Sequence, residues 1–406
     1  MENLELELEK NRQTEIVEPY KLPTGWKWCK QSEVCKLVDG EKIADKEYPY
    51  LEVKYLRGTK EKSFVTSGKL IKKGTKVILV DGENSGEVFT VPEDGFMGST
   101  FKALSIQNVD ENYLQFFIQT KKDLYRNNKK GSAIPHLNKE LFFNMPFPLP
   151  PTLAEQQRIV NRIETMFAKL DEAKEKAQNV VDNFETRKAA ILHKAFNGQL
   201  KIDNEELTVA DWEDTTIGEC CKLGSGGTPS KSHPEYYENG IIPWLKTGEI
   251  DWNDIYDVEE RITNEGVENS SAKIFPSESV VVAMYGMGVT RGKAAIIKIP
   301  TTTNQAVCVL QPNEKLNNRF LFYYFMCNYW QIREQSVGGN QLNLSGKIIA
   351  SFPIKLPPLN YQLSIVNFLD IVLEKESRAK EAAGTVLDQI ALLKKSILAR
   401  AFRGEL

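Results

Sequence analysis

Few residue groups in this chain of 406 residues have the types and spacing that catalysis needs. There is no GxxxxGK[ST] loop to hold nucleotide phosphates, and no Asn/Asp-Pro-Pro-aromatic motif of the kind that amino-methyltransferases use. The six cysteines show no CxxC spacing and there are only three histidines, which disfavours a structural zinc site and a disulfide framework. A reducing cytoplasm is the default compartment for such thiols. These absences favour a binding protein over an enzyme.

Two short motifs come closest to a chemical signature. The glycines of MYGMGVTRGK (284–293) resemble a dinucleotide-binding loop, but their spacing is one residue off GxGxxG and the strand-like AAIIKI follows in place of a helix. We interpret the segment as a loop on a β-hairpin, with Arg291 and Lys293 available to a polyanion. Residues 172–174 (Glu-Ala-Lys) resemble part of a nuclease motif, but a solvated helix face is the far commoner explanation.

The sequence segments that contain the predicted structural elements occur twice in the chain. Residues 153–200 align without a gap with residues 359–406, and 19 of the 48 positions are identical. Both copies follow a Pro-Pro pair, and both contain QxxIVN and end in AFxGxL. Chance does not produce such a match, so the chain is a tandem repeat.

The repeat extends upstream of the helical segments. Residues 26–37 align with residues 212–223, and the growing offset gives the second unit about 21 extra residues, which we place in the turn-rich stretch 224–240. We divide the chain into an acidic N-terminal extension (1–21), a first globular domain (22–151), a central helix (152–200), a second globular domain (201–351) and a C-terminal helix (352–406).

The globular domains are expected to be mixed α/β, which makes the fold class α+β. Short β-branched runs at 76–80 and 279–283 end at glycines and predict strands. Aromatic residues recur at a helical period in 111–126 and 315–335 and predict helices there.

The two long helices carry the seam of a coiled coil. Positions 163 to 191 step by three and four residues and are apolar except at Arg187, and the equivalent positions 369 to 397 are apolar except at Glu376. An antiparallel pairing in which facing residue numbers sum to 563 joins Arg187 to Glu376 and Leu170 to Leu393. A shift by one heptad would bury each charge without a partner.

This register implies a pseudo-two-fold axis, with the coiled coil separating the two domains. The alternative is two separate helices, each packed on its own domain. Thr152 and Glu155 predict a capping box at the start of the first helix, and Gly198 and Gly404 are the expected stops.

On these motifs the chain resembles the specificity subunit of type I restriction-modification systems, from residue 26 to 406. The resemblance rests on the duplicated PP…QxxIV…AFxGxL segment, on IPWLKTGEI (242–250), on MYGMGVTRGKAAII…TTTNQAVCVLQPN (284–313) and on GGNQLNLSGKIIASFPIKLPP (338–358). The chain departs from the family pattern in its extension MENLELELEK and in the first-domain loop DGENSG.

The resemblance implies two target recognition domains, each reading half of a bipartite site in double-stranded DNA. It implies helices that set the spacer and dock two methyltransferase (modification) subunits. S-adenosylmethionine, ATP and Mg are then expected in the partner subunits, including a restriction and translocation subunit, and no cofactor or metal is expected in this chain. The apolar run 320–327 is only eight residues long, and no signal peptide is visible, so we expect a cytoplasmic protein.

The net charge of −3 is unevenly distributed along the repeat. Residues 22–150 hold 20 Lys and Arg against 16 Asp and Glu, residues 201–272 hold 5 against 17, and residues 273–347 hold 8 against 3. Phosphate contacts need Lys and Arg, and base edges are read by Arg, Asn and Gln. We therefore expect the DNA-facing part of the second domain to be built from 273–347.

The DNA-binding candidates of the second domain are its polar loop residues. They are Tyr285, Arg291, Lys293, Asn304, Gln305, Arg333, Asn340, Gln341 and Asn343, with Ser225, Thr228 and Lys246 as loop supports. The amides of 304–305 could equally be structural groups that satisfy a buried turn. The aromatic run 320–325 is interpreted as core and not as a platform for stacked bases.

The comparable set in the first domain is mostly basic. It consists of Lys54, Arg57, Lys60, Lys62, Lys69, Lys72, Lys129, Lys130, Ser132 and His136. The pair Lys129-Lys130 is the preferred phosphate contact, although a solvated charge run explains any single lysine equally well, and a packed histidine is the commoner explanation of His136.

Two other functions fit the sequence. One is a stand-alone DNA-binding scaffold or decoy without modification partners. The other is a detached targeting module of a fused enzyme, which is disfavoured because the last helix ends in the full motif RAFRGEL.

Overall fold

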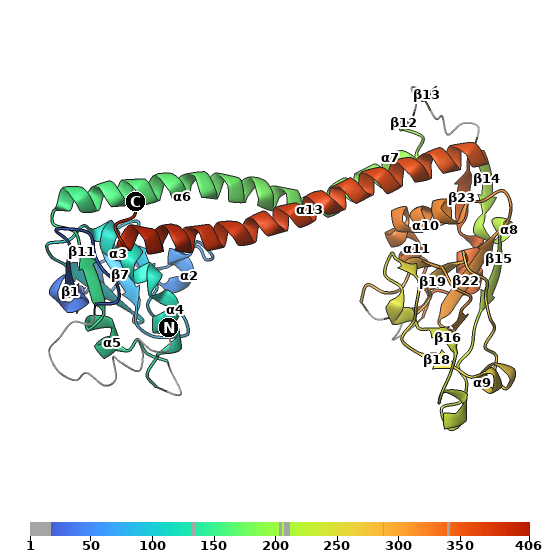
Figure 1. Ribbon diagram of the computed structural model, residues 1–406, viewed down its shortest axis with the longest axis horizontal. Coiled ribbons are helices and arrows are strands. Elements are labelled where there is room, and N and C mark those ends of the chain that lie inside the picture. Colours follow the sequence, from blue (N-terminus) through green and yellow to red (C-terminus); the bar gives the residue numbers. More distant parts are fainter. Residues whose placement is uncertain (1–17, 132–134, 203–204, 207–211, 287, 339–341) are drawn as a thin grey trace. The chain divides into compact units, whose positions relative to one another are not determined.

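The computed structural model describes residues 18–131, 135–202, 205–206, 212–286, 288–338 and 342–406. The chain forms two compact units: unit 1 consists of Met1–Gln178 with Gly384–Leu406, and unit 2 of Asn179–Ala383. Each unit combines one globular domain with two long helical segments (Figure 1). In the described part of the chain, no helix has the length and apolar character needed to cross a bilayer.

The first domain consists of two sheets, a strand pair and short helices. A four-stranded sheet has the order β2-β10-β7-β8, a five-stranded sheet has the order β3-β6-β9-β4-β5, and β1 pairs with β11. The strands are β1 (Lys27–Lys30), β2 (Cys35–Val38), β3 (Glu41–Ile43), β4 (Tyr48–Leu51), β5 (Phe64–Val65), β6 (Gly68–Ile71), β7 (Lys76–Leu79), β8 (Val88–Thr90), β9 (Gly95–Met97), β10 (Phe101–Ile106) and β11 (Pro146–Leu149). The helices are η1 (Gln31–Glu33), α2 (Val53–Leu56), α3 (Glu111–Thr120), α4 (Lys122–Asn127) and α5 (Lys139–Phe143).

The second domain repeats this plan. Its sheets have the orders β15-β22-β19-β20-β17 and β18-β16-β21, and β14 pairs with β23. The strands are β12 (Lys201–Ile202), β13 (Glu205–Glu206), β14 (Glu213–Thr216), β15 (Cys221–Ser225), β16 (Ile242–Leu245), β17 (Asp254–Ile255), β18 (Arg261–Ile262), β19 (Val280–Ala283), β20 (Ala294–Ile297), β21 (Thr302–Thr303), β22 (Val307–Pro312) and β23 (Pro353–Leu356). The helices are α8 (Ile217–Cys220), η3 (Pro234–Tyr236), η4 (Thr247–Glu249), α9 (Asn264–Glu268), α10 (Asn318–Cys327), α11 (Tyr329–Glu334) and α12 (Gly346–Ser351).

Equivalent strands pair in the same way in both domains. The parallel pair β4 and β9 corresponds to the parallel pair β16 and β21, and β7 lies between β10 and β8 as β19 lies between β22 and β20. The predicted helices at 111–126 and 315–335 are confirmed, each as two consecutive helices. The extra residues of the second domain are not confined to 224–240, because the interval from β16 to β19 is also longer than the interval from β4 to β7.

Three elements form the long helical segments. They are α6 (Leu153–Asp182), α7 (Phe184–Phe196) and α13 (Leu359–Phe402). The central segment is interrupted only at Asn183, whereas α13 is continuous over 44 residues. Glu155 donates its backbone N–H to the Thr152 hydroxyl at 3.2 Å, but its carboxylate pairs with Arg158, so only the Thr152 half of the predicted capping box is present. Gly198 and Gly404 have positive φ, as expected at the predicted stops.

The repeated QxxIVN motif fastens each long helix to a domain. The buried Gln156 accepts a hydrogen bond from the Asp110 backbone N–H at 2.7 Å, and the buried Gln362 accepts one from Asn317 at 2.8 Å. Asp110 and Asn317 are the N-caps of α3 and α10. The duplicated glutamine therefore binds the N-terminus of the equivalent helix in both domains.

The repeated AFxGxL motif supplies a core phenylalanine to each domain. In unit 1, Phe402 packs against Tyr113 and Phe117 at ring-centroid distances of 5.0 and 5.4 Å. In unit 2, Phe196 packs against Phe320 and Tyr324 at 5.0 and 5.6 Å. The two domain cores thus each include the end of a long helix.

Candidate nucleic-acid interface

In the second domain, two predicted reading loops lie against each other. We call them loop A (284–293, between β19 and β20) and loop B (335–345, between α11 and α12). Leu344 of loop B donates its backbone N–H to the Met284 carbonyl at 2.9 Å, and the Arg291 guanidinium donates to the Leu342 carbonyl. Loop A and loop B therefore form one surface, although they are far apart in sequence.

Arg333 holds loop A in place from α11. Its guanidinium donates to the carbonyls of Arg291 and Gly288, the latter at 2.6 Å, and lies 5.0 Å from the ring centroid of Tyr329. The Tyr329 hydroxyl donates to the Val289 carbonyl. Arg333 was predicted to contact DNA, but in the structure its donors serve the backbone of the loop, which makes it a positioning residue.

Arg291 lies at the junction of the two loops with part of its donor set unused. Its Nε is buried without a hydrogen-bond partner, and so are Asn343 Oδ1 and Ser336 Oγ of loop B. Burial, and then the neighbouring charge of Arg333, lowers the pKa of Arg291. An unpaired buried polar atom costs about 1–3 kcal/mol, so any ligand or loop shift that supplies partners here is favoured.

The equivalent loops of the first domain also lie together. The loop 81–86 (DGENSG) contacts residues 129–136 through a backbone hydrogen bond from Gly82 to the Pro135 carbonyl at 2.8 Å. His136 Nδ1 lies 2.7 Å from Asp81 Oδ1, and Lys129 Nζ lies 2.6 Å from Glu83. His136 is therefore a loop contact and not a core histidine, since half of its side chain is exposed.

The basic candidates of the first domain are largely ion-paired. Lys130 pairs with Glu140 at 3.2 Å, Arg57 pairs with Glu87, and the remaining pairs are Lys60 with Glu52, Lys62 with Glu93, Lys69 with Asp39 and Lys72 with Asp94. Lys54 is exposed on α2. Exposed pairs of this kind contribute only about 0–1 kcal/mol, so phosphates can compete with the carboxylates for these ammonium groups.

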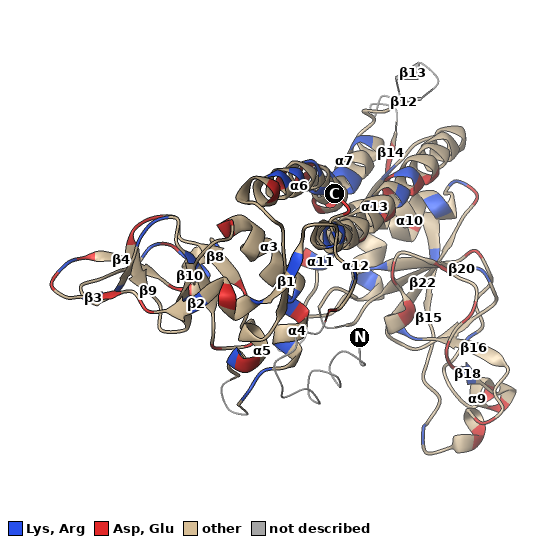
Figure 2. Ribbon diagram, turned by 60° about the vertical axis from the view of Figure 1, so that its left-hand side comes forward, with Lys and Arg blue, Asp and Glu red and all other residues tan. Residues whose placement is uncertain are grey.

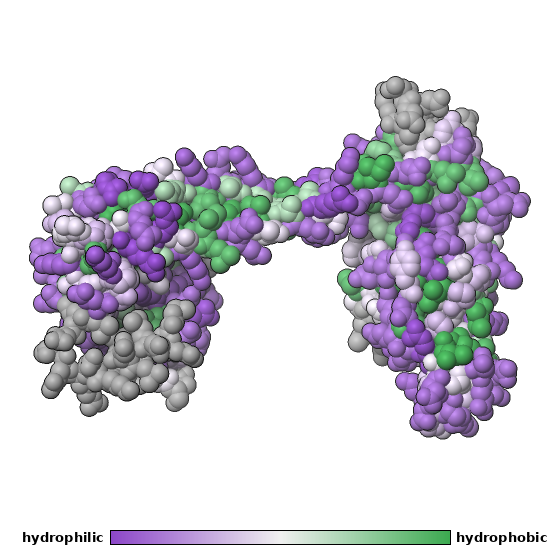
Figure 3. Space-filling model, in the orientation of Figure 1, coloured by the Kyte–Doolittle hydropathy of each residue, from purple (hydrophilic) through white to green (hydrophobic). Residues whose placement is uncertain are grey.

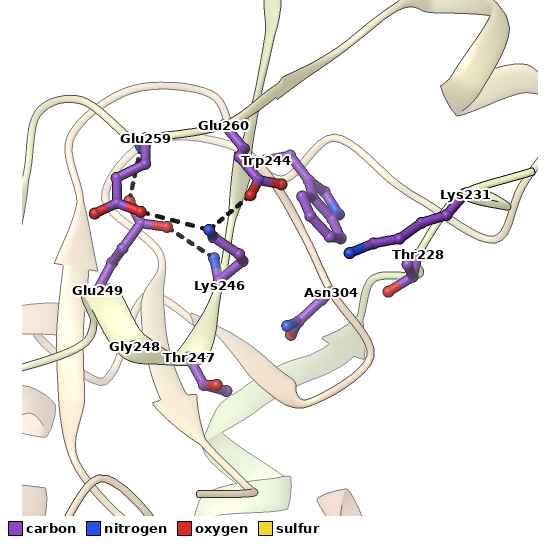
Figure 4. Close-up of a pocket in the computed structure, with 10 residues that line it drawn as sticks. All are labelled: Thr228, Lys231, Trp244, Lys246, Thr247, Gly248, Glu249, Glu259, Glu260 and Asn304. Carbon is purple, nitrogen blue, oxygen red and sulfur yellow. Dashed lines mark hydrogen bonds and ion pairs between the residues drawn. The ribbon is translucent and has the colours of Figure 1, made fainter. Parts of the chain in front are cut away.

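Two of the three loop supports of the second domain, Thr228 and Lys246, line a depression of about 640 Å³ (Figure 4). Lys246 pairs with Glu260 at 2.8 Å and with Glu259 at 3.4 Å, and Asn304 Oδ1 accepts from the Ala306 backbone N–H at 3.0 Å. Figure 4 shows Thr228, Lys231 and Asn304 on the side opposite the carboxylates.

This depression is not a phosphate cradle, because three glutamates (Glu249, Glu259 and Glu260) face two lysines there. Carboxylates accept hydrogen bonds from cytosine, and an amide such as Asn304 can pair with adenine. The sequence-based prediction did not include the three glutamates and Lys231, because the counts of charged residues favoured the basic stretch 273–347.

The remaining candidates are spread over the second domain. Thr228 donates to Gln305, Lys293 pairs with Asp251, Ser225 is exposed on β15, and Tyr285 is 39% exposed in loop A. Ser132, Asn340 and Gln341 lie outside the described residues. The aromatic run 320–325 is core, as predicted, because only Tyr324 in it is not buried.

Ion pairs join the acidic and the basic stretch of the second domain. Lys293 of the basic stretch pairs with Asp251 of the acidic stretch, and Arg319 pairs with Asp254 at 2.5 Å. Figure 2 shows both signs of charge interspersed on the two domains. The fold thus brings the two stretches into contact, and the expectation that the DNA-facing part is built from 273–347 stays a prediction.

The thiols and acids of the described residues form no metal site. All six cysteines are free, and in the described ranges no three His, Cys, Asp or Glu side chains are grouped to hold a metal ion. Burial raises the pKa of Cys35 and Cys308 to about 12, so these thiols stay protonated at neutral pH.

The helix register that was predicted from two charges is visible inside unit 2. Arg187 Nε donates to Glu376 Oε2 at 2.8 Å, so these two residues face each other across α7 and α13. In unit 1, Asp171 of α6 pairs with Lys394 of α13, next to Leu170 and Leu393. The contact between Leu170 and Leu393 itself stays a prediction.

Val386 and Leu393 depart from the predicted seam, because they are 38% and 49% exposed. Leu387 and Lys394, one residue later, are the more buried positions. Ala383 and Ile390 of the predicted seam remain buried, at 6% and 4% exposed. An α-helix drifts by about 20° per heptad from a 3.5-residue repeat, which turns the buried face of α13 toward the later edge of the seam.

The comparisons with known proteins agree with this geometry. The model of the type I restriction modification DNA specificity domain matches residues 23–182 and 210–382. The chain is 27% identical to the type I restriction enzyme MjaVIII specificity subunit of Methanocaldococcus jannaschii, over 95% of this chain and 94% of the relative. It is 31% identical to the EcoR124I/EcoR124II specificity subunit of Escherichia coli, over 39% of this chain and 40% of the relative.

Two solved structures share the fold. A chain from "Structural basis underlying complex assembly and conformational transition of the type I R-M system" aligns with a TM-score of 0.72 at 20% identity, over 96% of this chain and 100% of its own length. The HsdS subunit from Thermoanaerobacter tengcongensis aligns with a TM-score of 0.64 at 20% identity, over 96% of this chain and 99% of its own. With two matched domains and an α+β fold repeated in tandem, the chain belongs to the type I restriction-modification DNA specificity family.

Proposed function

We propose that each globular domain reads one half of a bipartite site in double-stranded DNA, through its pair of adjacent loops. In the second domain these are loop A and loop B, and in the first domain they are 81–86 and 129–136. The observation that carries the proposal is the junction of Arg291, Ser336 and Asn343, where three buried polar atoms lack partners. Such groups find partners on base edges or phosphates once the loops enter a groove.

The long helices would fix the spacer between the half-sites. This part of the proposal is supported by the continuity of α13 over 44 residues, about 66 Å at 1.5 Å per residue, and by its participation in both units. The ion pair of Arg187 with Glu376 supports a single register of the helices in unit 2. A fixed register would give a fixed distance, which a bipartite site with a constant spacer requires.

The helices would also dock two methyltransferase subunits. Exposed apolar side chains on α13, among them Leu392 at 67% and Leu393 at 49%, support this role, and Figure 3 shows hydrophobic surface along the helix pair of unit 1. S-adenosylmethionine, ATP and Mg would act in the partner subunits. The cytoplasm is the expected compartment, because the DNA and these partners are found there.

Methylome sequencing of cells with and without the chain tests the reading role. A bipartite methylated motif should vanish with the gene, and exchange of residues 22–151 or 201–351 for those of a relative should change one half of the motif only. Methylation that is unchanged without the chain contradicts the proposal. A decoy without modification partners would neither co-purify with a methyltransferase subunit nor restore methylation when mixed with one.

A further inference from the structure

The repeat allows each helix face of unit 2 to be compared with its equivalent in unit 1. On α13 in unit 1, Lys394 pairs with Asp171 of α6, and its Nζ lies 4.8 Å from the ring centroid of Phe167. The cation therefore has both a carboxylate and an aromatic face. Lys394, Asp171 and Phe167 thus satisfy one another on this face of the helix pair in unit 1.

In unit 2 the lysine remains but both of its partners are absent. The equivalents of Lys394, Asp171 and Phe167 are Lys188, Ser377 and Leu373, and these three line one depression. A serine offers no charge and a leucine no π face. Among the described residues, no carboxylate forms an ion pair with the Lys188 ammonium group. Burial lowers the pKa of Lys188 by more than the nearby charges of Glu185 and Asp251 raise it, so the ammonium group gains from a further carboxylate that reaches it.

A second contact of unit 1 is replaced beside it. Lys395 of α13 pairs with Asp123 of α4 at 3.1 Å in unit 1, and the equivalents in unit 2 are Ala189 and Trp330. Trp330 is 67% exposed and, with Ala189, lines a groove of about 540 Å³. Where unit 1 has an ion pair, unit 2 has an open groove with an indole on its wall.

The groove is apolar and its other charges are paired. We call it the α7 groove, lined by Glu185, Lys188, Ala189, Leu192, Trp252, Val289, Lys293, Met326, Cys327, Tyr329 and Trp330. Lys293 pairs with Asp251, and Glu185 lies 3.8 Å from Lys380. Glu185 and Asp251 act on Lys188 only as neighbouring charges, without an ion pair to it among the described residues, so the complementary ligand carries one negative charge beside an apolar group.

The Trp330 side chain is packed between two neighbouring side chains. The Arg333 guanidinium lies 5.6 Å from its ring centroid on one side, and Tyr329 packs on it at 4.9 Å. Tryptophan is one of the residue types that contribute most to the binding energy of protein interfaces, and Lys188 lines the same groove. A DNA phosphate would satisfy Lys188 but would leave the indole exposed, so a protein ligand fits the groove better.

We propose that the α7 groove docks a segment of the methyltransferase subunit that presents an Asp or Glu side chain to Lys188 and an aliphatic or aromatic side chain to Trp330. The inference rests on the proposed function, because it names the contact that one docking event uses. Unit 1 closes the same face with its own ion pairs. The two methyltransferase subunits are therefore held by different contacts, and the α7 groove serves only the one bound at unit 2.

Titration of the full-length chain with its purified cognate modification subunit, without DNA, tests this inference by calorimetry. The wild type should show two binding events. Lys188→Glu and Trp330→Ala should each weaken one event by about tenfold or more and leave the other unchanged. Ser377→Asp places the carboxylate of unit 1 next to Lys188, so it should weaken the same event while the melting temperature stays equal or rises.

Lys273→Glu, an exposed charge reversal away from the long helices, is the matched control and should bind like the wild type. Wild-type binding by folded Lys188→Glu and Ser377→Asp variants would overturn the inference, as would an equal loss of both events. Lower DNA affinity of Lys188→Glu with normal methyltransferase binding would assign the groove to a phosphate and overturn it as well. If the wild type binds no modification subunit, the proposed function fails and the inference with it.

Discussion

Arg187 of α7 donates from Nε to Oε2 of Glu376 on α13 at 2.8 Å, and its Nη2 donates to the Val180 carbonyl at 3.1 Å. At the equivalent positions in unit 1 the chain has Leu393 and Leu170. The two helical segments are thus distinguished by one charged layer in unit 2. A charged layer specifies register, because any slip leaves both charges without partners.

Reversal of one charge should destabilise unit 2, and reversal of both should restore it. Arg187→Glu places two carboxylates across the helix pair and should lower the free energy of unfolding by about 1–2 kcal/mol, since the pair is only partly buried. Arg187→Glu with Glu376→Arg should recover most of that loss in urea unfolding followed by circular dichroism. A double variant as unstable as the single one would mean that the pair does not specify the register.

The buried glutamines give a second prediction about stability. Gln362 bonds to the Asn317 N–H and to the carbonyls of Lys315 and Pro357, each at 2.8 Å, whereas Gln156 accepts from Asp110. Gln362→Leu leaves one buried and two partly buried backbone groups unpaired and should cost about 2–4 kcal/mol.

Gln156→Leu should cost less, about 1–3 kcal/mol, because fewer partners are lost. The exposed Gln157→Leu serves as the control and should change the free energy of unfolding by less than about 0.5 kcal/mol. Equal losses for Gln156→Leu and Gln362→Leu would contradict this account of the repeated motif.

The parts of the molecule that could be predicted from sequence are those set by local periodicity and by repetition. The long helices, their cap at Thr152 and the helices around Tyr113 and Phe320 follow from apolar spacing that neighbours in sequence determine. The drift of the seam at Leu393 could not be predicted, because it depends on how a continuous helix winds against its partner.

The sequence predicted which segments of the chain form the candidate site, but it did not predict the contacts between these segments. The loops around Arg291 and Asn343 were both identified. Their junction depends on a side-chain bond from Arg291 to the Leu342 carbonyl and a backbone bond from Leu344 to Met284, which join residues distant in sequence. Charge counts along the chain could not show ion pairing for the same reason, since Asp251 pairs with Lys293 from a distant segment.

Arg333 should be needed for its geometry and not only for its charge. Arg333→Lys keeps the charge but loses the fork that binds the carbonyls of Arg291 and Gly288, so loop A should become more open to proteolysis. Affinity for a DNA duplex that carries the full site should fall by about tenfold. The exposed Lys273→Ala should leave both properties unchanged, and wild-type affinity in the Arg333→Lys variant would refute the positioning role.

The pair of lysines on Asp39 predicts an acid-dependent change in stability. Hydrogen bonds from Lys102 and then Lys69 hold the pKa of Asp39 at about 2. Because this lies below the unfolded value, the carboxylate stabilises the fold above about pH 4, and the contribution is lost as the pH falls from about 4 to about 2. Asp39→Asn should therefore be less stable than the wild type at pH 7, by at most about 1 kcal/mol for so exposed a group, and equally stable near pH 2.

Salt dependence of DNA binding should reveal which first-domain lysines meet phosphates. Lys129 and Lys130 pair with Glu83 and Glu140 in the free chain, and these exposed pairs would be exchanged for phosphates on binding. The double variant Lys129→Ala with Lys130→Ala should weaken binding of all duplexes alike and reduce the slope of log K against log salt by about 2. Lys375→Ala, an exposed change on α13, is the control. An unchanged slope in the double variant would show that these lysines are a solvated charge run and that the phosphate contacts of the first domain lie elsewhere.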